Sequence, residues 1–526
     1  MGQAALKPGE AMTELDRVLD LLPQRFKGPG GVAGVVRDGR VIARRAWGYA
    51  DTAARLPMTA ATRLPICSIS KQFTCALLLD LVADPASLNA AVADLLPNFT
   101  GALPTIQNLA DNQSGLRDYW ALTVLHGAQP EQTFGHADAL PLIATTKSGH
   151  FAPGTSYSYA NNNFRILAEV LERHTGRTLD DLLTTRLFTP AGMKTAALLP
   201  DTRHNADGVV EYEGDPDAGY IPARNGIHWQ GDAGISATLD DMLAYEAHID
   251  ATRNDPASLY NRLSTPPRFA FGSAAAYGNG LSHEPVAGRA STGHGGALRG
   301  FRAHRRHFAS ERLSVVAMFN HEGDAHGAAV TLLEAALGHQ ADPPLPCPPG
   351  WDGVWLDQTH GLLVRLTAAP DDLTLSYGAA TTRLIPGPDG SATGDGVTVR
   401  RQGGHLWMHR SAENLTLIAQ PVMPVDGACG TAIAGRYWSQ DLDAALQIDA
   451  RDGAVFAGFD GRLGRGPMER MYPVADGIWA ITNRRSMDAP APGEWTVQVR
   501  RDSRGVTTGL VIGCWLARGV IYDRQD

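Results

Sequence analysis

The sequence contains little lysine, little cysteine and no long apolar run. Only five of its 46 basic residues are lysines. No two cysteines form a Cys-x-x-Cys pair, so we expect neither a thiolate metal site nor a disulfide framework; the five are Cys67, Cys75, Cys347, Cys429 and Cys514. Residues 1–22 lack the apolar core of a signal peptide, and no later run is long enough to span a bilayer. These absences predict a cytoplasmic protein with no membrane partner.

Positive charge and metal-binding patterns are also scarce. The formal net charge is −9 and the isoelectric point is near 6.0, which argues against nucleic acid as a partner. The 17 histidines show no zinc-site spacing. His321 and His326 are five residues apart, whereas a helical metalloprotease motif places its histidines four apart. We therefore expect no metal and no cofactor.

What the sequence does contain is enough for several folded domains. With 526 residues, 44% of them hydrophobic, the chain is too long for one domain of ordinary size. The proline-rich stretch 339–350 predicts a stiff linker. We divide the chain there into an N-terminal domain, 1–338, and two smaller C-terminal domains, 351–424 and 425–526.

The C-terminal part alternates short apolar strands with Gly, Asp and Pro turns and has almost no helical periodicity. A faint repeat relates Gly353-Val354-Trp355 to the later Gly435-Arg436-Tyr437-Trp438. The pattern predicts two small antiparallel β-barrels.

The N-terminal part mixes helical and strand patterns. Residues 14–25 have the apolar spacing of a helix, and residues 31–49 predict a hairpin that turns at Asp38-Gly39. Residues 291–304 and 313–320 predict two later strands that close the sheet begun near residue 31. The expected fold class is α+β, an antiparallel sheet covered by helices.

Ser68 and Lys71 lie one helical turn apart at the start of an apolar helix. Residues three apart share a helix face, so the two side chains should be neighbours. A hydroxyl is a weak nucleophile until a base removes its proton, and a desolvated lysine with a lowered pKa is such a base. No other lysine follows a serine at this spacing. The pair predicts nucleophilic catalysis, although Ser-x-x-Lys alone also fits an ordinary helix start.

A Tyr-x-Asn motif, Tyr159-Ala160-Asn161, follows a Pro-Gly turn and directly precedes a helical pattern. Side chains on a loop ahead of a helix can point into a cleft. A second Tyr-x-Asn, Tyr277-Gly278-Asn279, is surrounded by glycine and is followed by no helix. We therefore favour Tyr159.

The third motif is His294-Gly295-Gly296, which we place at the head of a late strand. Glycines there let the backbone of a ligand approach closely. A competing His-x-Gly, His321-Glu322-Gly323, follows a strand instead of opening one.

In this order, the three motifs resemble those of the penicillin-recognising serine hydrolases, which include class C β-lactamases, D-Ala-D-Ala carboxypeptidases and D-aminopeptidases. The resemblance implies a β-lactamase-like catalytic domain and acyl transfer through Ser68. It gives Lys71 and Tyr159 a shared part in removing the serine proton, without deciding which of them is the base.

The same resemblance gives roles to neighbouring residues. Backbone N–H groups of Ser68 and Ala297 would form an oxyanion hole, and Gly295 and Gly296 would lie beside the substrate. Asn161 would orient Lys71 and the substrate amide. His294 would form a hydrogen bond with Tyr159 or polarise the pocket.

The histidine in the third motif and the two barrels resemble the D-aminopeptidase branch in particular. That likeness implies a small peptide or amide substrate with a free D-amino terminus, and a homodimer. It also implies that a loop of the last barrel reaches the active site. The long loop 483–493 is the candidate, and Asp488 in it would pair with the substrate ammonium; a solvated loop carboxylate is the alternative.

Two other functions stay open at this point. A β-lactamase-like esterase or a D-Ala-D-Ala carboxypeptidase would use the same motifs, although such enzymes do not need the barrels. A catalytically silent peptide-binding protein would use the hydrolase domain as a scaffold, and the presence of all three motifs argues against it.

Overall fold

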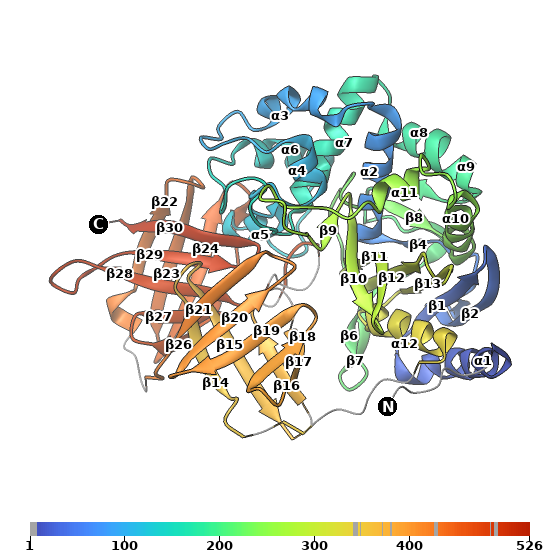
Figure 1. Cartoon of the computed structure of the whole chain (residues 1–526). Helices are drawn as coiled ribbons and strands as arrows, with labels where there is room; N and C mark the ends of the chain where they lie inside the picture. Colours follow the sequence, from blue (N-terminus) through green and yellow to red (C-terminus); the bar gives the residue numbers. More distant parts are fainter. Residues whose placement is uncertain are drawn as a thin grey trace.

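The structure is a computed structural model that describes residues 8–339, 346–347, 349–370, 372–378, 381–425, 430–483, 485–488 and 493–525. Much of the predicted linker 339–350 lies outside the described residues, and the domain bounds 1–338, 351–424 and 425–526 stay predictions. Figure 1 shows a mixed helix and sheet region at one side, with two strand-only bodies packed beside it. No helix of the described part is long and apolar enough to cross a membrane.

An antiparallel sheet of eight strands forms the centre of the N-terminal region, in the order β3-β2-β1-β13-β12-β11-β10-β9. Its strands are β1 Gly30–Arg37, β2 Arg40–Asp51, β3 Leu56–Pro57, β9 Tyr277–Gly278, β10 Leu281–Val286, β11 Arg289–Leu298, β12 Phe301–Phe308 and β13 Leu313–Phe319. In the pairing of β1 with β13, Gly34 lies opposite Val316. The prediction that late strands close the sheet begun near residue 31 is confirmed.

The hairpin between β1 and β2 turns where the sequence predicts it. Asp38 and Gly39 have φ angles of 51° and 72°, the left-handed conformation that a two-residue hairpin turn requires. Arg37 and Arg40 pair across the turn.

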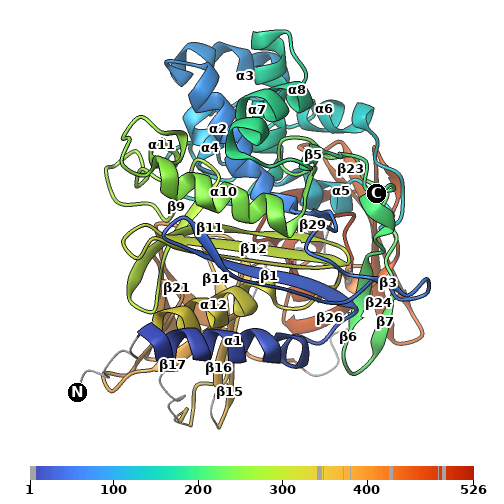
Figure 2. The same ribbon diagram turned by 90° about the vertical axis from the view of Figure 1, so that its right-hand side faces the viewer.

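Helices cover both faces of the sheet (Figure 2). The helices on one face are α1 (Pro8–Arg25) and α12 (Ala325–Leu337), and those on the other include α2 (Ser70–Leu81) and α10 (Leu239–Thr252). Ala33 and Val35 of β1 pack into the core that α1 and α12 share, whereas Val32 and Val36 pack into the core that contains α2 and α10. Burial on both faces explains the continuous apolar sequence of β1.

The segment between β3 and β9 supplies the rest of the helical layer and two small sheets. Its other helices are α3 Ala90–Leu95, α4 Ile106–Ala110, α5 Tyr119–Leu125, α6 His136–Ala144, α7 Asn161–Thr175, α8 Leu179–Leu183, α9 Thr189–Ala191 and α11 Leu259–Leu263. The small sheets contain β4 Leu64–Pro65, β8 Ile235–Ala237 and β5 Ala197–Leu198, and separately β6 Tyr212–Asp215 and β7 Gly219–Pro222.

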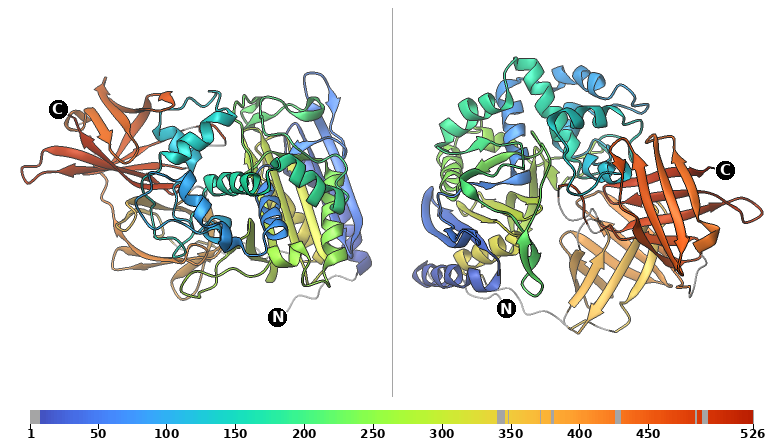
Figure 3. Two further views of the ribbon diagram at one scale, coloured as in Figure 1. Left: turned by 90° about the horizontal axis from the view of Figure 1, so that it is seen from above. Right: turned by 180° about the vertical axis from the view of Figure 1, so that it is seen from behind.

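The C-terminal strands form two antiparallel barrels, as the sequence predicts (Figure 3). The first is closed by β14 Gly353–Asp357, β15 Leu362–Ala369, β16 Asp372–Ser376, β17 Thr381–Pro386, β18 Ser391–Gly394, β19 Val397–Gln402, β20 His405–Arg410 and β21 Leu415–Pro421. In the second, the pairing of β23 with β24 closes the ring formed by β22 Gly435–Ser439, β23 Ala444–Arg451, β24 Ala454–Gly461, β26 Glu469–Ala475, β27 Ile478–Ile481, β28 Trp495–Arg501, β29 Thr507–Cys514 and β30 Ala517–Arg524. A two-residue strand, β25 (Gly464–Arg465), is appended to β24.

The third motif lies in the middle of a strand, not at its head. Residues 291–304 contain parts of two strands, β11 and β12, joined by a turn at Gly300 with φ 77°. His294 therefore has five strand residues before it in β11. The glycine-rich sequence around Gly293 hides the strand start because glycine carries no strand periodicity.

Candidate active site

Ser68 lies in a short 3₁₀ turn, Cys67–Ile69, that leads directly into α2. The Lys71 side chain is fully buried and its Nζ lies 2.9 Å from Ser68 Oγ. The same nitrogen donates to Asn161 Oδ1 at 2.8 Å and to the carbonyl oxygen of Asp232 at 2.7 Å. These two carbonyl oxygens can only accept. A neutral Lys71 would therefore use its two N–H groups on them and present its lone pair to the Ser68 hydroxyl.

The electrostatics of the pocket favour that neutral form. Burial lowers the pKa of Lys71 to about 8, although the charges of Asp232 and Asp118 oppose the shift. About a tenth of Lys71 is consequently unprotonated at pH 7, far more than for a lysine with the ordinary pKa. The structure thus brings Ser68 and Lys71 together in the arrangement that the helical spacing predicts.

The backbone around the serine is tightly constrained. Cys67, the residue before it, has φ 50°, a left-handed conformation that a non-glycine residue rarely adopts. Gly296 of β11 lies against this turn, and a Cβ at that position would be 2.4 Å from the carbonyl oxygen of Ile66. Gly296 is therefore needed first for packing β11 against the chain that enters Ser68. The sequence predicts only a close approach by a ligand at this glycine.

Tyr159 lies in the loop before α7, and Asn161 is the first residue of that helix. The Tyr159 ring centroid lies 4.8 Å from Lys71 Nζ, and the nearby Ser68 side chain acts to lower the pKa of the Tyr159 hydroxyl. Burial raises the pKa of Tyr159 well above its usual value, so its hydroxyl stays protonated. The Lys71 amine and a neutral tyrosine therefore both lie near Ser68.

Asp118 and Asp232 belong to the site although no sequence pattern indicated them. Asp118 caps α5 and accepts from the backbone N–H of Asn161 at 2.6 Å and from Asn161 Nδ2 at 2.9 Å. Asp232 accepts from the hydroxyl of Tyr119 at 2.8 Å. Asp118 lies 43 residues before Asn161 in the sequence, so the contact between them is purely tertiary.

His294 is fixed as a neutral imidazole. Its Nδ1 donates to the carbonyl oxygen of Gly295, so its Nε2 accepts from the Tyr277 hydroxyl, at 2.9 Å. Burial, helped by the Lys71 charge, lowers its pKa to about 3. The hydrogen bond goes to Tyr277 and not to Tyr159, which was one of the two expectations. The second Tyr-x-Asn, which we had set aside, therefore supplies a residue to the site through Tyr277.

The edge of β11 beside these groups is open. Strand β10 pairs with β11 only as far as Gly293, while β12 pairs with its other edge up to Leu298. Among the described strands, none therefore covers the β10 side of β11 from His294 to Leu298. The N–H and C=O groups of an extended ligand can pair with such an edge.

A cleft of about 630 Å³ brings the predicted residues together. Its walls include Ser68, Tyr159, Asn161, His294, Gly295, Gly296, Ala297 and Asp488. Asp488 belongs to the loop that leaves the last barrel after β27, and Leu516 of the same barrel also lines the cleft. No group of three or more His, Cys, Asp or Glu side chains among the described residues is placed to hold a metal ion.

Within residues 485–488 of the barrel loop, Asp488 is the residue whose charge acts on Lys71. Ser486 Oγ donates to Asp488 Oδ1 at 3.0 Å, and the Asp488 carbonyl oxygen accepts from the backbone N–H of Arg299. Burial, and then the charge of Asp118, raises the pKa of Asp488 to about 7. Among the described residues its carboxylate forms no ion pair, although the loop is firmly tied to the catalytic region.

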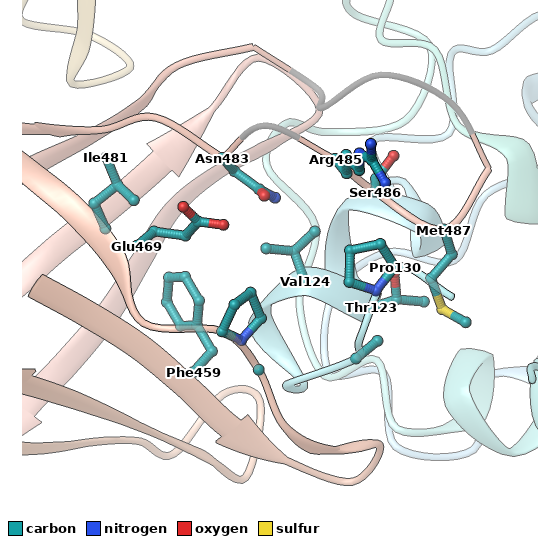
Figure 4. Close-up of a pocket in the computed structure, with 13 residues that line it drawn as sticks. Thr123, Val124, Pro130, Phe459, Glu469, Ile481, Asn483, Arg485, Ser486 and Met487 are labelled. Carbon is teal, nitrogen blue, oxygen red and sulfur yellow. The ribbon is translucent and has the colours of Figure 1, made fainter. Parts of the chain in front are cut away.

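A small cavity lies behind this loop (Figure 4). Thr123 and Val124 of α5 lie on one side of it, and Phe459 of β24 lies on the other. Its volume is about 20 Å³, enough for a single water at most. It is a packing gap between the barrel and α5 and not a ligand site.

The comparisons with known proteins agree with this geometry. Residues 15–340 match the family described as Beta-lactamase, and residues 345–523 match the family described as D-aminopeptidase, domain B. A D-aminopeptidase of Cereibacter sphaeroides is 60% identical over 510 residues, which cover 97% of this chain and 98% of the relative. The chain belongs to the D-aminopeptidase family. A further D-aminopeptidase, from Brucella melitensis, is 47% identical over 520 residues, covering 98% of this chain and all of the relative.

Solved structures share the fold of this D-aminopeptidase family member at much lower identity. The octameric penicillin-binding protein homologue from Pyrococcus abyssi has a TM-score of 0.54 and 17% identity, over 86% of this chain and 99% of that one. The D-amino acid amidase from Ochrobactrum anthropi SV3 has a TM-score of 0.51 and 18% identity, over 62% and 98%. These likenesses show the β-lactamase-like fold.

Proposed function

We propose that this protein is a serine aminopeptidase that releases an N-terminal D-residue, small and alanine-like, from peptides, amides and esters. The observation that carries the proposal is the buried Lys71 amine at 2.9 Å from Ser68 Oγ, beside a cleft that also holds the Asp488 carboxylate, which forms no ion pair with any described residue. Membership of the D-aminopeptidase family supports the same activity.

The reaction is acyl transfer. Lys71 takes the proton of Ser68 as Oγ attacks the substrate carbonyl, and the C–N bond of the tetrahedral intermediate then breaks. Tyr159 donates its proton to the leaving amine and recovers one from Lys71. Water then attacks the ester on Ser68 by the reverse relay, which frees the D-amino acid.

Lys71 is a better candidate for the base than Tyr159. Its pKa is lowered to about 8, whereas the pKa of Tyr159 is raised well above 10. A group with a pKa near the working pH is the more efficient base. This assignment also uses the hydrogen-bond pattern at Nζ, which leaves the lone pair facing Ser68.

Substrate alignment follows from the open edge of β11. Backbone N–H groups of Ser68 and Ala297 would hold the oxyanion, each contributing about 3–4 kcal/mol to transition-state stabilisation. Gly295 and Gly296 would run beside the substrate, and Asn161 would orient its amide. Neutral His294, held by Tyr277, would shape the pocket and carry no positive charge into it.

Asp488 would bind the substrate ammonium. A buried carboxylate that lacks a cation is stabilised by an arriving ammonium group, and the same site penalises substrates whose N-terminus is acylated. This contact would make the enzyme an aminopeptidase and not an endopeptidase.

The test is a comparison of enantiomers. We expect D-alanyl p-nitroanilide to be hydrolysed far faster than L-alanyl p-nitroanilide, with activity lost in Ser68→Ala. Equal rates on the two enantiomers, or faster turnover of nitrocefin or p-nitrophenyl acetate, would contradict the proposal.

Assembly and location are also proposals. We infer a homodimer, which light scattering of the purified protein would test. A cytoplasmic location is likewise a proposal, and cell fractionation would test it.

A further inference from the structure

A continuous series of hydrogen bonds leads from the last barrel to the nucleophile. The carbonyl oxygen of Leu516 accepts from the backbone N–H of Asp118 at 2.9 Å. Asp118 Oδ1 accepts from both nitrogens of Asn161, at 2.6 and 2.9 Å. Asn161 Oδ1 accepts from Lys71 Nζ at 2.8 Å, and Nζ lies 2.9 Å from Ser68 Oγ.

Asp118 decides which way the Asn161 amide points. A carboxylate only accepts, so it holds the NH₂ end of the amide and turns the oxygen end toward Lys71. With the amide reversed, two donors would face each other at Lys71, and Nζ would lose one of the carbonyl oxygens that direct its lone pair to Ser68. Asp118 lines the cleft, but its Oδ1 is occupied by the two nitrogens of Asn161, so it acts on Lys71 through Asn161.

The residue before Asp118 is also held by the last barrel. Arg117 is buried, and its Nε donates to the carbonyl oxygen of Arg518 at 3.1 Å. Its Nη1 donates to Asp441 Oδ2 at 3.0 Å and to Ser148 Oγ at 2.9 Å. The barrel therefore holds Arg117 through Arg518 and Asp441, and Asp118 through Leu516. These contacts are independent of the loop that carries Asp488.

We infer that Asp118 is a positioning residue, and that the seating of the last barrel on Arg117 and Asp118 sets the geometry of the Ser68–Lys71 pair. The barrel would then serve the chemical step as well as substrate selection. The inference rests on the proposed function, because it concerns the rate of that reaction.

The charges around Asp118 predict a measurable change in the pKa of Lys71 when Asp118 is replaced. The charge of Asp118 acts on Lys71 of α2 and on Asp488 of the barrel loop, and Asp232, from the segment before β8, acts on the same lysine. Burial raises the pKa of Asp118 to about 6, so it is ionised at pH 7.5, and its charge raises the pKa of Lys71. Removing the charge should therefore lower the pKa of Lys71.

The first experiment measures kcat against pH for Asp118→Asn and Asp118→Ala with D-alanyl p-nitroanilide. We expect kcat to fall about 100-fold, as for a misplaced reacting group, while the acid limb moves to lower pH. Asp357→Asn, which removes a fully buried carboxylate from the first barrel, is the matched control and should leave kcat unchanged. A folded Asp118 variant, by circular dichroism, with an unmoved acid limb or an unchanged kcat would overturn the inference.

The second experiment separates barrel seating from general interface stability. Asp441 and Asp443 both form ion pairs with the catalytic region, but Asp441 pairs with Arg117 and Asp443 pairs with Lys147, at 2.8 Å. We expect Asp441→Ala to lower kcat about tenfold with little change in KM, and Asp443→Ala to do neither.

Equal effects of the two alanine variants would overturn the inference and leave the proposed function intact. The proposed function fails separately, if the unmodified protein does not hydrolyse D-alanyl p-nitroanilide or if Ser68→Ala retains the activity.

Discussion

At the scale of single residues, Lys71 Nζ combines burial with three hydrogen bonds whose partners differ in kind. Two partners are carbonyl oxygens, and the third is the Ser68 hydroxyl. An arginine could not replace this side chain, because a guanidinium does not give up its proton. The scarcity of lysine elsewhere in the chain makes this position conspicuous even in the sequence.

The pH dependence of kcat/KM should report two groups that must lose a proton. Asp488, with a pKa of about 7, must be charged to bind an ammonium, and Lys71, with a pKa of about 8, must be neutral to act as base. Because both need deprotonation, kcat/KM should rise with pH, steeply below about 7 and less steeply up to about 8. A profile that falls across this range would contradict the roles given to both groups.

Asp488→Asn should remove the steeper part of that profile and weaken selection for a free amine. We expect kcat/KM for D-alanyl p-nitroanilide to fall about 10- to 100-fold, equivalent to the ~1.5–3 kcal/mol of a hydrogen bond to a charged group. The N-acetylated substrate is the internal control, because it carries no ammonium and should lose nothing. A parallel loss on both substrates would mean that Asp488 does not recognise the amine.

At the scale of elements, the site depends on how closely β11 packs against the turn that carries Ser68. The two glycines of the third motif differ in this respect. A Cβ on Gly296 would be 2.4 Å from a backbone oxygen, whereas the nearest atom to a Cβ on Gly295 would belong to the His304 ring, at 3.2 Å. The first contact cannot be relieved by moving a side chain, and the second can.

Gly296→Ala should therefore be far more harmful than Gly295→Ala. We expect Gly296→Ala to lower kcat/KM about 100-fold, because it displaces the serine turn, and to lower the melting temperature. Gly295→Ala is the matched control and should fold with a small change in both quantities. Steady-state kinetics and calorimetry on the two variants would decide, and a reversed order would contradict the packing role of Gly296.

At the scale of the whole molecule, the last barrel contributes to the cleft of another domain. Its loop is anchored by Arg485, which pairs with Glu131 at 2.9 Å and with Glu213 at 3.2 Å. Arg299 of the catalytic region pairs with the same two glutamates, so four charged side chains hold the loop in place. This cluster keeps Asp488 in the cleft.

Loosening this anchor should affect substrate binding more than chemistry. Arg485 is nearly half exposed, so we expect Arg485→Ala to raise KM by up to about fivefold, in line with the ~1 kcal/mol upper end of exposed ion pairs. The effect should shrink at high salt. Arg465→Ala, which breaks an exposed pair with Asp460 on the same barrel, is the control and should leave KM unchanged. An equal KM for both variants would show that the anchor does not position the loop.

Much of the fold was accessible from the sequence because its signals are local. The Asp38-Gly39 turn, the apolar strand β1 and the turn-rich C-terminal strands each follow from short-range preferences, and the structure confirms the α+β region with two barrels. The start of β11 was misplaced because glycine gives no periodicity to read.

The sequence by itself determined the chemistry: Ser68 and Lys71 are neighbours because a helix brings residues three apart onto one face. Only the tertiary structure decided what surrounds that pair. Asp118 meets Asn161, and Tyr277 meets His294, across gaps of 43 and 17 residues. Such contacts depend on how separate elements pack, which no local pattern encodes. They govern the Asn161 amide orientation, the partner of the His294 imidazole and the pKa of Lys71, and through these the reactivity of the serine.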